Sequence, residues 1–145
     1  MKKLFTKICI ASDHAGYDLK EKIKDNLIKK SISVIDLGPF SKDSVDYPDY
    51  AKKVAKRLIL KKSDAGILVC GSGTGMAITA NKFKGIRAAQ CYNKNSTILS
   101  RQHNNSNIIC LGSRMLKYKE AFKYVTYFLY TKFESGRHQK RVNKI

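Results

Sequence analysis

The chain has 145 residues, of which 43% are hydrophobic and 28% charged, proportions that fit one globular domain with a core of its own. Its 29 Lys and Arg residues exceed its 11 Asp and Glu residues and give a net charge of +18. No apolar stretch is long enough to span a membrane. Lys7 and then Ser12, Asp13 and His14 interrupt the apolar N-terminal residues, so we expect no export signal.

The first half of the chain alternates strand and helix. Residues 7–12 are a short apolar run that predicts a strand, and apolar side chains at four-residue spacing predict a helix over 19–30. A second strand is expected over 32–37. A second amphipathic helix is expected over 50–59, with Pro48 in its first turn.

The second half continues the alternation. An apolar run predicts a third strand over 65–70, followed by a helix from the next glycines to about residue 84. A fourth strand is expected over 86–91 and a polar helix over 93–102. Residues 107–111 predict a fifth strand.

The chain ends with an amphipathic helix predicted over 121–133 and a basic tail beyond Gly136. Five strands separated by helices indicate an α/β fold with one parallel sheet, covered by helices on both faces through right-handed crossovers. We therefore predict a single, doubly wound domain over residues 1–145.

The lysines are spread over every segment instead of forming one stripe with aromatic residues. A solvated, lysine-rich surface is the simplest interpretation, and a nucleic-acid-binding surface is the alternative. No acidic residue lies between Asp64 and Glu120. A site in that stretch would favour a small anionic ligand.

The four cysteines form no CxxC pair, which argues against a disulfide framework or a zinc site and favours a reducing cytoplasm. Cys70 differs from Cys9 and Cys110 because it stands where a strand opens into the loop Gly71-Ser72-Gly73-Thr74-Gly75. Ligands of open α/β sheets bind at this end of the strands. Cys70 is either a buried small side chain or a thiolate stabilised by the loop N–H groups.

The glycine loop does not match the common nucleotide-binding patterns. Met76 replaces the last glycine of the dinucleotide fingerprint, the acidic residue that would hold a ribose is missing, and no Walker lysine follows. A loop that holds a sugar phosphate or an enediolate fits better. Ser72 can donate to such an oxyanion or cap the following helix.

The histidines and arginines add a second group of candidates. Asp13 and His14 follow the first strand, so the parallel sheet brings them to the same edge as Cys70. His103 precedes the fifth strand, and His138 lies in the tail. Four arginines in the last third of the chain are candidate phosphate clamps: Arg101, Arg114, Arg137 and Arg141. The tail arginines are otherwise part of a frayed terminus.

Eight motifs, in chain order, resemble those of the type B ribose-5-phosphate isomerases. They are SDHAG at 12–16, DYP at 46–48, CGSGTG at 70–75, ANK at 80–82, GIRA at 85–88, SRQHN at 100–104, GSR at 112–114 and GRHQKR at 136–141. The resemblance covers essentially the whole chain.

This resemblance implies an isomerase of the pentose phosphate pathway that interconverts ribose 5-phosphate and ribulose 5-phosphate through a cis-enediolate, without metal or cofactor. It implies that Cys70 is the general base, that His103 assists ring opening, and that Ser72 with the loop amides holds the enediolate. The implied amides are those of Gly71, Gly73, Thr74 and Gly75. The implied sugar contacts are Asp13, His14, Tyr47 and Asn104, and the implied phosphate ligands are Arg114, Arg137, His138 and Arg141.

The family's dimers and tetramers imply sites at subunit interfaces, with the tail 134–145 docked on a partner subunit. One branch uses a glutamate just after the glycine loop as base, and here that position is Met76. A galactose 6-phosphate branch lacks Cys70, which argues against that activity. Allose 6-phosphate isomerisation and a non-catalytic sugar-phosphate- or nucleic-acid-binding protein remain alternatives.

Overall fold

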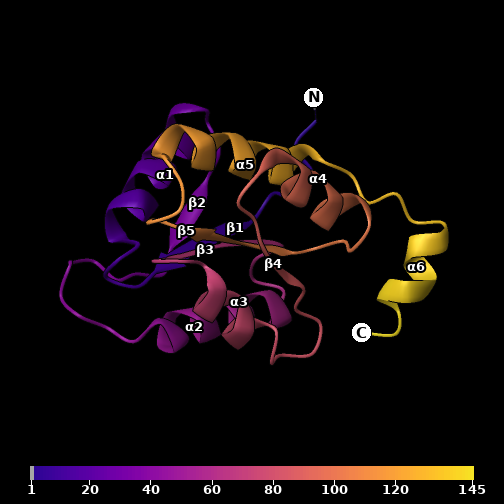
Figure 1. Ribbon diagram of the computed structural model, residues 1–145, viewed down its shortest axis with the longest axis horizontal. Helices are drawn as coiled ribbons and strands as arrows, with labels where there is room; N and C mark the ends of the chain where they lie inside the picture. Colours follow the sequence, from indigo (N-terminus) through magenta and orange to yellow (C-terminus); the bar gives the residue numbers. More distant parts are fainter. Residues whose placement is uncertain (1) are drawn as a thin grey trace.

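The computed structural model describes residues 2–145 as a central parallel sheet with helices around it (Figure 1). The elements in chain order are β1 (Ile8–Ser12), α1 (Tyr17–Lys29), β2 (Val34–Asp36), α2 (Tyr47–Ile59), β3 (Ala65–Cys70), α3 (Thr74–Ala80), β4 (Ala88–Gln90), α4 (Lys94–Gln102), β5 (Ile108–Gly112), α5 (Tyr118–Tyr130) and α6 (Arg137–Val142). Within these residues no helix combines the length and apolar character needed to cross a membrane.

The strands lie in the order β2-β1-β3-β5-β4, and every neighbouring pair is parallel. Helices α1, α4 and α5 cover one face of the sheet, and α2 and α3 cover the other (Figure 1). The predicted α/β fold, with five parallel strands and helices on both faces, is confirmed.

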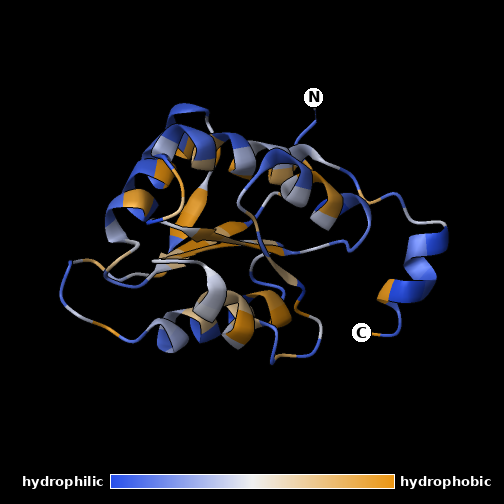
Figure 2. Ribbon diagram, viewed as in Figure 1, coloured by the Kyte–Doolittle hydropathy of each residue, from blue (hydrophilic) through white to orange (hydrophobic). Residues whose placement is uncertain are grey.

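The core lies on both sides of the sheet because successive strand residues point to opposite faces. Ile10, Ile67 and Ile109 pack against α1 and α5, whereas Leu68 and Cys110 pack against α2 and α3. Figure 2 shows the strands as hydrophobic and the outer faces of the helices as hydrophilic. Burial on both faces explains why the strands are continuous apolar runs in the sequence.

Two strands and one helix are shorter than the sequence predicts. Strands β2 and β4 are the edges of the sheet, where each has one neighbour and is only partly buried, so pairing stops early. Helix α3 ends at Ala80 instead of about residue 84. Asn81 pairs with β4 there, because its amide donates to the Ala88 carbonyl oxygen (2.9 Å) and accepts from the Ala88 N–H (2.8 Å).

The C-terminal tail contains a helix that the sequence analysis did not predict. Residues Arg137–Val142 form α6, which lies beyond α4 and away from the sheet (Figure 1). Its His138 is only 6% exposed. The interpretation of the tail as a frayed terminus is therefore wrong.

Among the described residues, Lys20 is the one lysine that is completely buried. It connects α1 to β2 and to the turn that follows β2. Its Nζ donates to both carboxylate oxygens of Asp36 (2.8 Å each), to Glu21 (2.9 Å) and to the carbonyl oxygen of Pro39 (2.9 Å). Burial by itself raises the pKa of Asp36, but the hydrogen bonds from Lys20 and Lys24 outweigh it and hold that pKa below its usual value.

Replacing Asp36 with Asn should lower the free energy of unfolding by about 3–5 kcal/mol at neutral pH, because buried Lys20 loses its main partner charge. The folded-state pKa of Asp36 is depressed, so this stabilisation is complete above the unfolded value of about 3.9 and is lost as the pH falls through the folded pKa.

Urea unfolding of wild type and Asp36→Asn, at neutral pH and at about pH 2.5, measures the difference. The gap between the two proteins should shrink at the lower pH. Asp25→Asn, on the same helix as Lys20, is the matched control and should change stability little. A gap that stays constant across the pH range would contradict the assigned role of Asp36.

Candidate active site

The carboxyl ends of β1, β3 and β5 meet at one edge of the sheet, and the glycine loop lies there. Cys70 is the last residue of β3 and is 4% exposed. The backbone N–H of Gly73 donates to its Sγ at 3.1 Å. Gly73 has a φ of +82°, a conformation that a side chain disfavours, and α3 begins at the next residue. The turn thus directs a backbone donor at the sulfur.

The other three cysteines lie in different surroundings. Burial raises the pKa of the Cys9 thiol to about 11 and also raises the pKa values of Cys91 and Cys110. Burial therefore disfavours the thiolate form of these three cysteines. All four cysteines are free of disulfides.

Neighbouring segments fix the glycine loop in place. Gln90, at the end of β4, donates through Nε2 to the Ser72 carbonyl oxygen (2.9 Å) and to the Thr74 hydroxyl (2.8 Å). The Arg114 N–H donates to the Gly71 carbonyl oxygen at 3.0 Å. Ser72 Oγ accepts from the Thr74 N–H at 3.2 Å, which leaves the Ser72 O–H free to donate to a ligand.

Two predicted ligand residues lie against this loop. A Cβ on Gly71 would come within 2.9 Å of Arg114 Nη1, and a Cβ on Gly75 would come within 2.6 Å of the Tyr47 ring. Only glycine allows both side chains to approach this closely. The structure therefore brings Tyr47 and Arg114 together with Cys70, as predicted.

Asp13 and His14 lie beside the same edge. Asp13 is buried, and its Oδ1 accepts from the Gly16 N–H at 2.9 Å, while its own N–H donates to the Val69 carbonyl oxygen at 3.1 Å. His14 contacts the backbone of Val45 through Nδ1 at 3.2 Å. Asp13, His14 and residues 44–49 line a cavity of about 540 Å³. A cavity of this size accommodates a small sugar phosphate.

The remaining predicted residues form a separate cluster at the far end of the molecule. His103 is the C-cap of α4, which leads back to the amino end of β5, and Asn104 follows it. The rings of His103 and His138 stack with centroids 4.1 Å apart. Burial and the positive charges nearby lower the pKa of His138. His103, Asn104, His138 and Arg141 line a second hollow of about 270 Å³.

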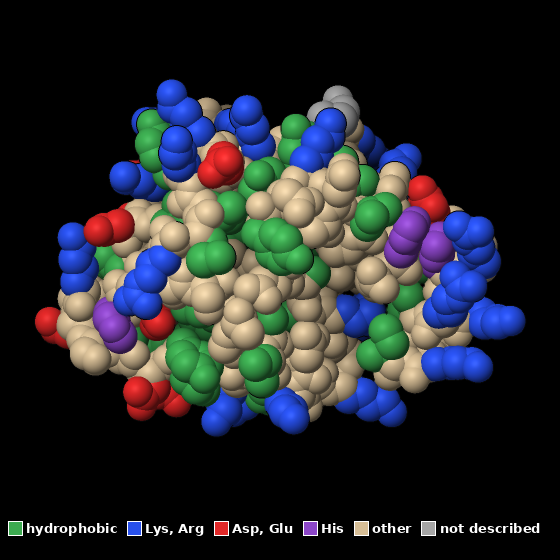
Figure 3. Space-filling model, viewed as in Figure 1, with side chains coloured by type: hydrophobic (Ala, Val, Ile, Leu, Met, Phe, Trp, Pro, Cys, Tyr) green, Lys and Arg blue, Asp and Glu red, His purple; other side chains and the backbone are tan. Residues whose placement is uncertain are grey.

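One chain therefore does not bring all the predicted site residues together. Figure 3 shows one histidine at the left end of the molecule and a histidine pair at the right end. The left end carries the segment between β2 and α2, and the right end carries α6 (Figure 1). Cys70 and His103 belong to opposite edges of the parallel sheet. Cys70 lies at the carboxyl end of β3, whereas His103 lies in the segment that leads into the amino end of β5.

Arg101 does not belong to either cluster of candidate ligands. It is 4% exposed, its Nε donates to the Thr131 carbonyl oxygen at 3.1 Å, and its guanidinium stacks on Phe5 and Phe128. Burial lowers the pKa of Arg101 to about 10. The prediction that Arg101 is a phosphate clamp is wrong, because the side chain is buried and its Nε and Nη1 already donate to oxygens within the protein.

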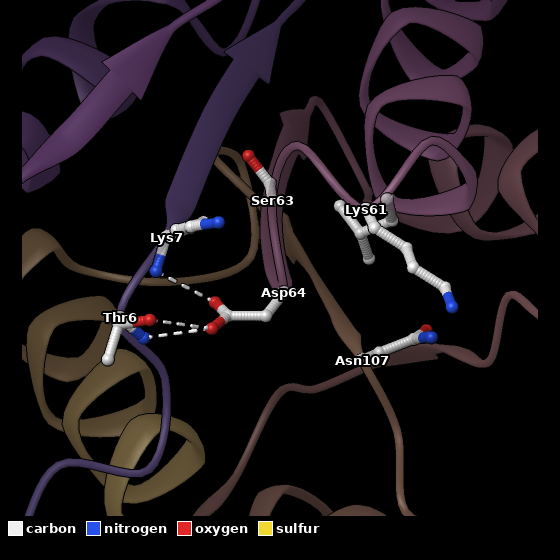
Figure 4. Close-up of a pocket in the computed structure, with 7 residues that line it drawn as sticks. Thr6, Lys7, Lys61, Ser63, Asp64 and Asn107 are labelled. Carbon is white, nitrogen blue, oxygen red and sulfur yellow. Dashed lines mark hydrogen bonds between the residues drawn. The ribbon is translucent and has the colours of Figure 1, made fainter.

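A further hollow of about 320 Å³ lies at the amino ends of β1 and β3 (Figure 4). Its carboxylate, Asp64, accepts from the Thr6 N–H and hydroxyl and from the Lys7 N–H at 2.9–3.1 Å. The hollow lies away from the edge where α/β sheets bind ligands, and its acid is already paired.

The family model described as Ribose/Galactose Isomerase matches residues 8–145. The chain belongs to this family. It is 44% identical over 139 residues to the ribose-5-phosphate isomerase B of Escherichia coli, covering 96% of this chain and 93% of that one. It is 49% identical over 138 residues to a putative sugar phosphate isomerase of Rickettsia bellii, covering 95% and 96%.

Solved structures of isomerases agree with this family membership. The Thermotoga maritima ribose 5-phosphate isomerase superposes with a TM-score of 0.94 at 50% identity and 96% coverage of both chains. The Mycoplasma genitalium ribose-5-phosphate isomerase B with bound ribulose-5-phosphate superposes with a TM-score of 0.89 at 45% identity, covering 95% of this chain and 92% of that one. The family predicted from the motifs is confirmed.

Sequence reasoning missed two residues beside the clusters of this isomerase. The sequence predicts only a strand at Gln90, and no local signal indicates that its amide reaches the glycine loop. The sequence analysis places Glu134 in the tail 134–145 and gives it no role of its own, yet its Oε2 lies 3.6 Å from His138 Nε2 and 4.0 Å from His103 Nε2. Its spacing of four residues from His138 is the signal that could have found it.

Replacing Gln90 with Leu should loosen the glycine loop without unfolding the protein. The variant loses two hydrogen bonds worth about 1 kcal/mol each, so the loop amides should exchange hydrogen roughly tenfold faster or more. Hydrogen exchange of the peptide that covers residues 70–75 measures this effect, and peptides from α1 serve as the internal control. Unchanged exchange in the loop peptide would show that Gln90 does not hold it.

Proposed function

We propose that this protein interconverts ribose 5-phosphate and ribulose 5-phosphate through a cis-enediolate, with Cys70 as the general base. The observation that carries the proposal is the N–H of Gly73 directed at Cys70 Sγ, within a loop packed against Tyr47 and Arg114. A backbone donor stabilises a thiolate in preference to a thiol. Names of relatives and of superposed structures support the substrate assignment.

The proposed reaction moves one proton between neighbouring carbons. The Cys70 thiolate removes the proton from C2 of the open-chain aldose, and the electron pair flows toward the C1 carbonyl oxygen to form the enediolate. The same sulfur returns the proton to C1, while the C2 hydroxyl gives up its proton to become the carbonyl and the C1 oxygen takes up a proton to become the hydroxyl. This chemistry needs a base and strong stabilisation of the oxyanion, and we assign the second task to Ser72 and the amides of Gly71, Gly73, Thr74 and Gly75.

We assign the remaining residues to substrate binding. Asp13, His14, Tyr47 and Asn104 contact the sugar, His103 assists opening of the furanose ring, and Arg114 binds phosphate with Arg137, His138 and Arg141. The Cys70 loop lies in the stretch between Asp64 and Glu120, which contains no acidic residue, and this favours an anionic substrate. The reaction requires no metal in this scheme, since the amides stabilise the enediolate. Free cysteines support a reducing, cytoplasmic setting.

The complete site combines two subunits in this proposal. The cluster at Cys70 and the cluster at His103 lie at opposite ends of one chain, so each needs the other from a neighbouring copy. The tail that carries α6 would then dock beside the partner's glycine loop. A homodimer is the smallest assembly that satisfies this requirement, and a tetramer of such dimers also does.

Replacing Cys70 with Ala should lower kcat for ribose 5-phosphate by at least about 10³-fold, because no other group in the loop can accept the proton. The matched control is Cys91→Ala, which removes a buried thiol outside the loop and should retain turnover. Turnover of wild type should persist in EDTA. Full activity of the Cys70 variant, or a requirement for added metal, would refute the mechanism. Allose 6-phosphate assayed in parallel ranks the two substrates.

Mixing two inactive variants should restore activity if each site spans two subunits. A heterodimer of Cys70→Ala and His103→Ala has one site with both changes and one intact site. Random reassociation should therefore recover roughly a quarter of wild-type activity. Activity is measured after the two proteins are unfolded together and refolded, with each variant refolded alone as the control. No recovery from a mixture that forms heterodimers would show that one chain supplies the whole site.

A further inference from the structure

His103, Glu134 and His138 form a cluster of metal-ligating side chains that the proposed isomerisation does not use as a metal site. Their ligand atoms lie within 4.8 Å of one another, the only such group of three found in residues 2–145. Glu134 Oε2 is the central atom, 3.6 Å from His138 Nε2 and 4.0 Å from His103 Nε2. Imidazole and carboxylate together are ligands that divalent zinc accepts readily.

Backbone contacts hold the three side chains on a common frame. The Glu134 N–H donates to the carbonyl oxygen of Gln102 at 3.0 Å, which fixes the segment before α6 against the last turn of α4. Arg101 ties the same two segments through the Thr131 carbonyl oxygen at 3.1 Å. His138 follows one turn after Glu134, and its N–H donates to the Ser135 carbonyl oxygen at 2.9 Å. These contacts therefore keep the three side chains near one another in the absence of a metal.

The distances between the ligand atoms are slightly longer than those in a zinc site, so the side chains must move a little to bind the ion. Ligand atoms at about 2.0–2.2 Å from a tetrahedral zinc lie roughly 3.3 Å apart. The side chain of His138 is only 8% exposed and stays in place, whereas those of His103 and Glu134 are 37% and 50% exposed. The stacked rings place their nitrogens side by side, so His103 must tilt out of the stack for both nitrogens to face one ion.

We propose that His103, Glu134 and His138 bind a divalent transition-metal ion, with zinc as the physiological representative, and that the bound ion inhibits the isomerase. Three protein ligands leave a fourth position for water. Positive charge from Arg137 and Arg141 beside the cluster opposes a dication, so we expect affinity in the micromolar range, below that of closed four-ligand sites. The inhibition, but not the binding, rests on the proposed function, in which His103 and His138 contact substrate.

Binding is tested directly with cobalt(II), whose visible absorption strengthens when the ion leaves water for a four- or five-coordinate site. The titration uses a Cys70→Ser background, which removes the thiol beside the glycine loop as a competing ligand. We expect a cobalt spectrum that zinc displaces, and a dissociation constant at least about tenfold weaker in Glu134→Gln. His103→Gln should weaken it similarly, and Asp43→Asn, an exposed acid far from the cluster, should not.

Inhibition is tested with otherwise wild-type protein that retains Cys70. Zinc at ten times its dissociation constant should raise the apparent KM about tenfold by competition, with kcat unchanged. Glu134→Gln should retain isomerase activity and lose this sensitivity. No cobalt spectrum, or a spectrum unchanged in Glu134→Gln, would overturn the metal site whether or not the protein turns over ribose 5-phosphate. Zinc inhibition that persists in Glu134→Gln would overturn its assignment to this cluster.

Discussion

All five strands run in the same direction, and this shared direction decides where each candidate side chain can lie. Residues that follow a strand, such as Cys70 and Asp13, are carried to one edge of the sheet. Residues that end a returning helix, such as His103, are carried to the opposite edge. No local adjustment of loops can reverse this, because every strand pairs in parallel with its neighbours. The separation into two clusters is a consequence of the topology.

The first cluster depends on close backbone packing around the glycine loop. Gly73 turns the chain so that its N–H reaches Cys70, and the absence of side chains at Gly71 and Gly75 lets Arg114 and Tyr47 approach. Lys20 holds the turn at Pro39 through a hydrogen bond to its carbonyl oxygen. The chain continues from this turn to residues 44–49, which line the cavity beside Asp13 and His14. The buried charge of Lys20 and the glycines of the loop thus both position residues at the same edge of the sheet.

Much of this could be predicted from the sequence because the signals were local. Continuous apolar runs gave β1, β3 and β5 nearly to the residue, and the glycines placed Cys70 at a strand end. The early end of α3 could not be predicted, since it depends on Asn81 pairing with Ala88 across the fold. Helix α6 is too short to be stable alone, and its stability depends on His138 packing against His103, a contact between distant segments.

Glu134 acquires its importance from the scarcity of acids in this chain. Several carboxylates are already engaged elsewhere: Asp64 with the backbone of Thr6 and Lys7, Asp36 with Lys20, and Asp13 with the Gly16 N–H. At the second cluster Glu134 is the acid that faces both histidines, beside the arginines to which we assign phosphate binding. Its single negative charge makes a cation tolerable there, while the surrounding positive charge keeps an anion favoured. In our proposals the same few side chains therefore bind either of two ligands of opposite charge, and the balance between them depends on one carboxylate.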